Sequence, residues 1–354
     1  MDILGLERGA FFCEAYWVTF GGDFEDKNIL HHPEPLAAIA KRLGLSLEAI
    51  QRELQRDRQT LRSVRDKRVW PALDDKVLCS WNALMIGALA RAGAVFSIPK
   101  YIAAAEAAAK FIQQSMTKDD GRLVHAWRNG TTEIDGFLED YSYLAEALVA
   151  LFEFTGNPIY IDQACGLVSV MVHRFHDEQG GFYFTASDSE TLITRYKDQH
   201  DGSVPSGNSM AATALVRLAR LTNDPHLIQL AQETIHQASY MMHHSHGSVC
   251  QMLLALEHYI GPSVDWIYVS KTPEGIQQAI GHAFATLRPR SIVVVSHEQS
   301  DGRNSLSGSK VSSLVEGRKL GENESVVLYQ CIDGACTLPV CIQMTSNKNE
   351  LQKE

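Results

Sequence analysis

Apolar residues recur along most of the chain with the period of an α-helix, in two alternating kinds of segment. Segments of the first kind are apolar on nearly all sides, which predicts inner helices buried all round: 80–93, 138–155 and 207–221. Segments of the second kind have one apolar and one polar face, which predicts outer helices: 98–117, 158–176 and 225–244. The pattern therefore predicts three pairs, each of an inner and an outer helix.

The three pairs form an internal repeat, because matching residues lie 59 and then 67 positions apart. One column holds Pro99, Pro158 and Pro225, each in the first turn of an outer helix, where the missing N–H is no loss. Other columns begin at Ala88, Leu89, Ile102, Ala105 and Gly121. Helical pairs of this length favour an α/α toroid over an open helical solenoid, whose repeats usually hold about 34–47 residues.

Other elements precede, interrupt and follow the repeat. Three further helices are predicted at 35–42, 46–68 and 248–260. The second of these interleaves arginines with acidic residues, as on a solvated outer face. Hairpin excursions are predicted at 123–130, which contains Asn129-Gly130, and at 181–189. A βαβ unit and one more strand are predicted from elements at 264–270, 273–287, 291–296 and 325–330.

These elements together predict a mainly α fold. Residues 1–262 are expected to form an incomplete α/α toroid, and residues 263–354 a small βαβ region. No Gly-rich phosphate loop follows the first strand of that region, so we expect no nucleotide cofactor there.

Composition narrows the class of protein. Hydrophobic residues make up 45% of the chain and charged residues 21%, as in soluble globular proteins. The longest apolar run, 83–90, is far shorter than the roughly 20 residues that cross a bilayer, and the first twenty residues lack the pattern of a secretion signal. The formal net charge of −10 disfavours a phosphate-binding surface. We therefore predict a cytoplasmic protein that binds neither membrane nor nucleic acid.

The seven cysteines predict reduced thiols, since their number is odd and four of them lie singly in helical or apolar stretches. Four residues separate Cys331 from Cys336, and four separate Cys336 from Cys341. This spacing matches neither the Cys-x-x-Cys of redox motifs nor the paired spacings of zinc ribbons. We therefore expect neither a metal nor a cofactor.

The predicted topology gathers chemically active residues at one end of the inner helices. Each inner helix begins where the preceding excursion ends, so we expect all three inner helices to begin at one mouth of the toroid, named rim A here. Trp81, Asp140 and Gly207 share one column of the repeat at this position. Helix N-termini supply N–H donors and positive potential, which suit a hydroxyl-rich or anionic ligand.

Carboxylates and aromatic side chains near rim A suggest a carbohydrate site. A pair of carboxyl groups is the usual acid/base machinery for cleaving a glycosidic bond, and the catalytic candidates are Asp74, Asp75, Glu139 and Asp140. Aromatic faces can stack on sugar rings and polar side chains can bind hydroxyls. The substrate-binding candidates are Trp81, Asn82, His125, Trp127, Tyr141, Tyr183, Ser206 and Asn208.

The same residue types also have purely structural uses. Asp and Ser near a helix start are commonly N-caps, which is the alternative for Asp140 and Ser206. Asp74 or Asp75 can simply pair with Arg68 or Lys76. Trp81 can belong to the core, and a lone histidine such as His125 is usually structural. The sequence leaves both interpretations open.

Several motifs resemble the spermatogenesis-associated protein 20 family, whose members are also described as thioredoxin-domain-containing proteins. They are LDDKVLCSWNALMI at 73–86, DGFLEDY at 135–141, GGFY at 180–183, PSGNS at 205–209, and the tail YQC at 329–331 with ACTLP at 335–339. The resemblance implies an α/α toroid of the six-hairpin glycosidase superfamily, with kinship to N-acylglucosamine 2-epimerases. It does not imply an established reaction.

The chain departs from the family pattern at its front. Full-length relatives begin with a thioredoxin-like domain, and their toroids use twelve helices, whereas nine are predicted here before residue 260. We therefore expect an open toroid and, as a candidate partner, a separate chain with the thioredoxin-like domain and the first toroid helices. Two functions follow: a toroid that binds or processes carbohydrate, of glycoside hydrolase or sugar epimerase type, or a non-catalytic scaffold that docks the missing domain.

Overall fold

The computed structural model describes residues 2–131, 134–190, 192–286, 288, 290–299, 303–321 and 324–342. The chain divides into two compact units, Met1–Asp74 and Asp75–Glu354. The predicted boundary at 262/263 separates helices from strands within the second unit, and as a domain boundary it stays a prediction.

The first unit is a small helical body with its own core. Its helices are α1 (Leu6–Ala15), α2 (Leu36–Leu43) and α3 (Leu47–Arg65), of which α1 was not predicted from the sequence. Phe12, Ile39 and Leu54 are among the side chains that close this core. The arginines of α3 are exposed, as their interleaving with acidic residues indicated.

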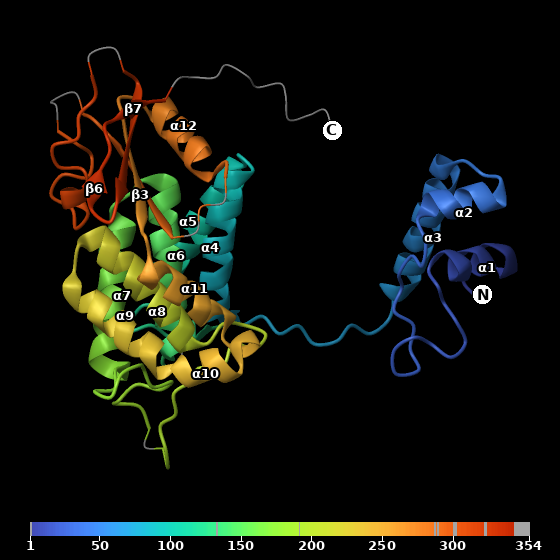
Figure 1. Ribbon diagram of the computed structural model, residues 1–354. Coiled ribbons are helices and arrows are strands. Elements are labelled where there is room, and N and C mark those ends of the chain that lie inside the picture. The colour runs from blue at the N-terminus through green and yellow to red at the C-terminus, as the bar shows by residue number, and fades with distance from the viewer. Residues whose placement is uncertain are drawn as a thin grey trace. The chain divides into compact units, whose positions relative to one another are not determined.

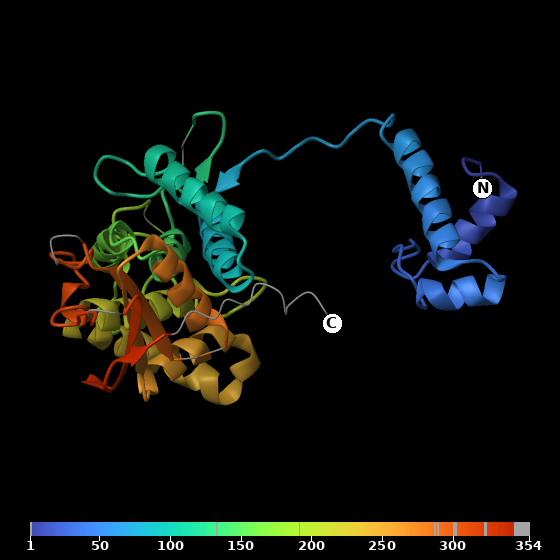
Figure 2. The ribbon, with the colours of Figure 1, turned by 90° about the horizontal axis from the view of Figure 1, so that it is seen from above.

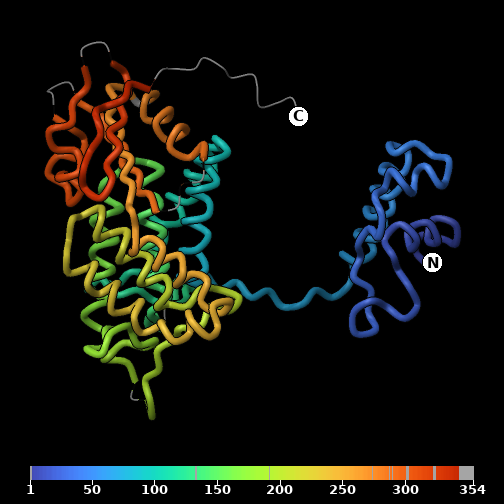
Figure 3. The backbone as a smooth tube through the Cα atoms, viewed as in Figure 1, coloured from blue at the N-terminus to red at the C-terminus, as the bar shows by residue number. Residues whose placement is uncertain are grey.

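The second unit contains every inner and outer helix that the repeat predicts (Figures 1 and 3). The inner helices are α4 (Cys79–Val95), α6 (Leu138–Thr155), α8 (Gly207–Thr222) and α11 (Cys250–Ile260). The outer helices are α5 (Pro99–Ser115), α7 (Ile159–Phe175) and α9 (Pro225–Gln237). The helix predicted at 225–244 is in fact two helices, because the chain turns at Ala238 before α10 (Ser239–His244).

The inner helices form the arc of an α/α toroid. Helix α6 packs between α4 and α8, α8 contacts α11, and each outer helix packs against the inner helix that precedes it. Helices α6 and α8 are buried along nearly their whole length, whereas α5, α7 and α9 bury one face each. The prediction of a mainly α toroid built from inner and outer helices is therefore confirmed.

A small α/β sheet follows the helices. Strands β3 (Val264–Ser270) and β4 (Ser291–His297) are parallel and flank α12 (Pro273–Phe284), which confirms the predicted βαβ unit. Strand β5 (Val326–Ile332) runs antiparallel to β3, so the sheet order is β4-β3-β5. Figure 1 shows these strands at one end of the helices and the loop that follows α7 at the other end. The predicted end of α12 at Leu287 lies outside the described residues.

Strand β4 contacts the C-terminal end of α6 at Gly156. This glycine ends the helix with a φ of 70°, and a Cβ placed there would lie 2.7 Å from the carbonyl oxygen of Val295. Gly44 ends α2 with a φ of 65°, but a Cβ there would meet nothing within 4 Å. The two glycines therefore share a backbone conformation and differ in the space around them.

Gly156→Ala is expected to lower the free energy of unfolding more than Gly44→Ala does. Both variants lose about 1–2 kcal/mol because an L-residue disfavours the left-handed conformation. Gly156→Ala loses roughly a further 1–3 kcal/mol because the methyl group must displace the β4 backbone. Urea titrations followed by circular dichroism measure both losses. Equal losses would show that β4 leaves room for a methyl group at residue 156.

The expectation of reduced thiols is wrong for Cys331 and Cys336, which form a disulfide. The tight turn at Asp333-Gly334 returns the chain from β5 into β6 (Ala335–Cys336) and sets these two cysteines directly opposite each other. The four residues between these cysteines therefore form a tight hairpin that places the two cysteines opposite each other. Cys341, in the short strand β7 (Val340–Cys341), is exposed and is not in a disulfide.

Helices α4, α6 and α8 all begin at one end of the toroid, and this end is rim A. Strand β1 (Val77–Leu78) leads into α4 and pairs with β2 (Ala126–Trp127) of the first hairpin, as Figure 2 shows. The turn Asn129-Gly130 has both residues at positive φ, as its sequence predicted. The second excursion joins the same end, because the N–H of Leu138 donates to the carbonyl oxygen of Phe184. Within the described residues, no helix has the length and apolar character needed to cross a membrane.

Candidate functional site

Asp140 holds rim A together. Its side chain is fully buried in the first turn of α6 and accepts hydrogen bonds from the N–H of Phe137 at 2.8 Å and of Ser80 at 2.9 Å. One bond caps the start of α6 and the other fixes the start of α4. The column that Asp140 and Trp81 share in the repeat therefore corresponds to a direct link between two helix starts.

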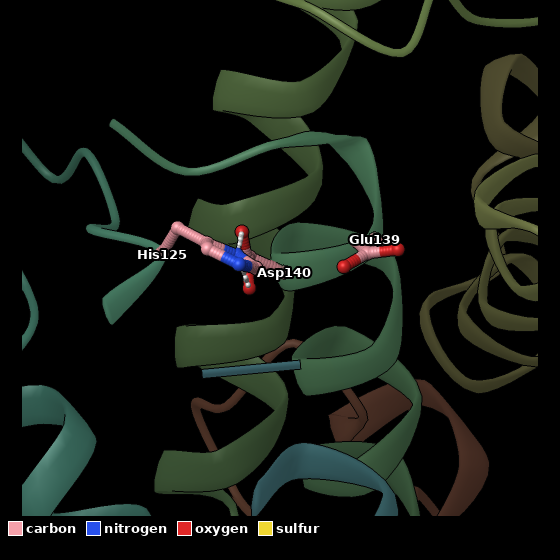
Figure 4. Close-up of side chains that lie close together, drawn as sticks. All are labelled: His125, Glu139 and Asp140. Carbon is pink, nitrogen blue, oxygen red and sulfur yellow. Dashed lines mark hydrogen bonds and ion pairs between the residues drawn. The ribbon is translucent and has the colours of Figure 1, made fainter. Parts of the chain in front are cut away.

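His125 and Glu139 lie on either side of Asp140 (Figure 4). The Nδ1 atom of His125, from the first hairpin, is 3.0 Å from Oδ2 of Asp140. Glu139 accepts a hydrogen bond from the hydroxyl of Ser80 at 3.1 Å. Ligand atoms of His125, Glu139 and Asp140 all lie within 4.8 Å of one another.

The pKa of each flanking group is raised, but the main cause differs between the two groups. Burial, followed by the charge of Asp140, raises the pKa of the Glu139 carboxyl above its usual value of 4.5. The hydrogen bond to Asp140, which outweighs partial burial, raises the pKa of His125 above 6.5. Both groups stay partly exposed, so both can exchange protons with a ligand.

Three residues that the sequence analysis did not select belong to this cluster. Ser80 bonds Glu139, Tyr143 donates to the carbonyl oxygen of Pro205 before α8, and Asp198 acts electrostatically on Glu139 and Tyr143. Tyr143 stands four residues after Glu139, which places both on one face of α6. That spacing was the available signal. Nothing in the sequence pattern singles out Asp198.

The other candidates near the start of α4 are exposed or have local structural contacts. Asp75 forms an ion pair with Arg128 of the first hairpin, and Asp74 is exposed. Trp81 is 62% exposed, whereas Trp127 packs edge-on against a phenylalanine of α5. Asn82 donates to the carbonyl oxygen of Leu78 and so serves the local backbone.

The remaining candidates hold the loops of rim A in place. The hydroxyl of Tyr141 accepts the N–H of Leu123 and the ring is buried. Ser206 caps α8, and Asn208 is buried with its amide bonded to the backbone of Phe182. Tyr183 lies under the guanidinium of Arg195, with 4.0 Å between that group and the ring centroid.

The cluster of His125, Glu139 and Asp140 has donor atoms close enough to share a metal ion, and the hydrogen bonds of Asp140 are those of a helix cap. Both oxygens of Asp140 already accept backbone N–H groups, and Nδ1 of His125 faces the same carboxylate. These bonds give Asp140 a structural role at the starts of two helices.

The fold and the rim define a partial α/α toroid with an attached α/β sheet. No protein-family model matches the chain. The chain is similar to spermatogenesis-associated protein 20 of Rattus norvegicus, with 34% identity over 213 residues that cover 57% of this chain and 27% of that protein. The human protein of the same name is 35% identical over the same length. These matches confirm the resemblance carried by the sequence motifs, and the chain spans about a quarter of the length of these relatives.

Further likenesses extend over other parts of the chain. An uncharacterized protein of Caenorhabditis elegans is 25% identical over 327 residues, which cover 90% of this chain and 44% of that protein. Among solved structures, cellobiose 2-epimerase of Bacillus thermoamylovorans aligns with a TM-score of 0.39 and 15% identity over 46% of this chain and 44% of the enzyme. The unsaturated glucuronyl hydrolase of Bacillus sp. GL1 aligns with a TM-score of 0.39 and 18% identity over 48% of each chain.

Proposed function

We propose that rim A binds a carbohydrate and that Glu139 and His125 exchange protons with it. The observation that carries the proposal is the pair of partly exposed groups on either side of buried Asp140. The raised pKa values of Glu139 and His125 bring both groups closer to the values useful for acid/base chemistry. The exposed ring of Trp81 at the start of α4 supplies an apolar face for a sugar ring.

Asp140 acts in this proposal as a positioning residue. Its oxygens are occupied by backbone N–H groups and by Nδ1 of His125, so it fixes the imidazole with the Nε2 atom directed away from the carboxylate. Glu139 supplies the carboxylate that faces a ligand. The acid/base pair is therefore Glu139 with His125, in place of the two-carboxylate pair suggested by the sequence.

The two groups have complementary charge states over a window of pH. Glu139 is ionised above its raised pKa and accepts a proton, while His125 is protonated below its raised pKa and donates one. Besides acting on each other, the two groups are acted on by Asp140, by Asp198 in the case of Glu139, and by Lys76 in the case of His125. Proton transfer to and from a sugar, by hydrolysis or epimerisation, is the reaction class that such a pair supports.

Glu139→Gln is expected to abolish turnover of a sugar substrate, or reduce it by about 100-fold or more, because a positioned acid/base group contributes about that much. The substrate is sought by thermal shift with a panel of mono- and disaccharides, and turnover is then followed by NMR. The activity of the wild type should be bell-shaped in pH, with both limbs above the ordinary pKa values of 4.5 and 6.5.

Glu178→Gln is the matched control, since it removes the same charge from an exposed side chain after α7. The proposal is contradicted if no sugar shifts the melting temperature of the wild type, or if Glu139→Gln keeps full turnover. The alternative, a non-catalytic scaffold, is favoured by the structural bonding of Asp140, Ser206 and Asn208, and it predicts no sugar-dependent shift.

A further inference from the structure

The disulfide of the β5–β6 hairpin lies beside a fixed positive charge. The Nη2 atom of Arg318 is 3.0 Å from the sulfur of Cys336 and 3.4 Å from that of Cys331. Arg318 is held there by a hydrogen bond to the carbonyl oxygen of Leu314, and its guanidinium lies over the ring of Tyr329. Because a neutral disulfide is a weak acceptor, this arrangement gains most once a sulfur becomes a thiolate.

The two sulfurs differ in access. Cys336 is exposed on the short edge strand β6, whereas Cys331 is 2% exposed in the core of the sheet. An attacking thiolate can therefore reach Cys336 and not Cys331. Attack on Cys336 makes Cys331 the leaving group, and its thiolate forms within reach of Arg318.

We propose that Cys331 and Cys336 form a redox-active pair that exchanges with an external dithiol, with Arg318 stabilising the thiolates. The dithiol thiolate attacks Cys336, the bond between the protein sulfurs breaks, and Cys331 leaves as a thiolate. The second thiol of the reductant then attacks its own sulfur in the mixed disulfide and releases Cys336. Two electrons pass to the protein, the reductant becomes a disulfide, and its two protons are available to the protein thiolates.

The hairpin lies where a change of redox state can act on the rest of the unit. Cys331 pairs across the sheet with Asp265 of β3, and Asp265 forms an ion pair with Arg220 of α8. Arg220, Asp265 and Arg318 line a cavity of about 360 Å³ together with both cysteines. The disulfide therefore borders the contact between the sheet and the inner helices.

The test follows reduction of the full chain by dithiothreitol, with thiols alkylated at intervals and the peptide that carries Cys331 and Cys336 counted by mass spectrometry. Arg318→Ala is expected to slow reduction by about threefold to tenfold, because the leaving thiolate loses its cation. In glutathione redox buffers, the same variant should shift the equilibrium about tenfold towards the disulfide.

Arg318→Lys should restore most of the rate, since it keeps the charge. Lys319→Ala is the matched control, because it removes an exposed positive charge one residue away. The pH profile of alkylation of the reduced native protein is a second measurement and needs no variant. It should show an apparent thiol pKa below the usual value of about 8.5. The other titratable and charged groups near Arg318 and the two thiols are Tyr329, Asp265 and Arg220. Free thiols at both positions in the air-oxidised protein, or an unchanged rate in Arg318→Ala, would overturn the proposal.

Discussion

Asp140→Ala is expected to lower the free energy of unfolding by about 3–5 kcal/mol, the range for breaking a buried charged interaction. The variant leaves the N–H groups of Phe137 and Ser80 without their acceptor inside the protein, and it removes the partner of His125. The variant therefore also loses the hydrogen bond that connects the start of α4 to the start of α6. Urea unfolding followed by tryptophan fluorescence measures the loss.

Two variants separate the structural role of Asp140 from its charge. Asp140→Asn keeps one acceptor oxygen and should lose less than the alanine variant. Glu139→Gln removes the neighbouring charge but only weakens a bond to the Ser80 hydroxyl, so its loss should be below about 1 kcal/mol. If Asp140→Ala and Glu139→Gln unfold at the same urea concentration, the carboxylate of Asp140 does not support the rim.

The difference between Asp140 and Glu139 shows how much of the site could be predicted from the sequence. The repeat column that contains Trp81 and Asp140 correctly predicted that two helix starts lie together, since Asp140 accepts the N–H of Ser80. It did not distinguish the capping carboxylate of Asp140 from the carboxylate of Glu139 that we propose acts on a ligand, because both are acidic residues in a first helical turn. Only the partners of Asp140 and Glu139 distinguish them: two backbone N–H groups for the first and a serine hydroxyl for the second.

The disulfide is a second feature that the sequence did not predict. Spacing alone gave Cys331 and Cys336 no recognised motif, because their pairing depends on the register of β5 with β6 and on a turn at Asp333. Helix α1 was not predicted because its apolar residues are less confined to one face than those of the shorter α2. Long inner helices, whose pattern repeats three times, were predicted most accurately.

The other large effect is expected inside the toroid, where Arg217 of α8 is buried between two carboxylates of α6. Its guanidinium donates to Glu146 and, at 2.5 Å, to Glu153, and all three side chains are at most 13% exposed. Glu153 also accepts the N–H of Val293, so the cluster connects α8, α6 and strand β4. Arg217→Met keeps much of the volume and leaves two buried carboxylates without this cation.

Arg217→Met is expected to cost about 3–5 kcal/mol at neutral pH, because removing one partner leaves buried charge uncompensated. Arg91→Met is the matched control, since Arg91 is 61% exposed and 4.0 Å from Glu146, and its loss should be below about 1 kcal/mol. Adding Glu153→Gln to Arg217→Met should recover part of the stability, because the double variant has one buried charge fewer.

The pH dependence of this loss has a definite sign. Burial already raises the pKa of Glu153 above 4.5 in the folded protein, and removing Arg217 should raise it further. A carboxyl group whose pKa is raised by folding favours the folded state when it is protonated. The stability difference between Arg217→Met and the wild type should therefore shrink as pH falls through the pKa of folded Glu153. A loss that stays constant from neutral to acidic pH would mean that Arg217 acts through packing alone and does not compensate the charge of Glu153.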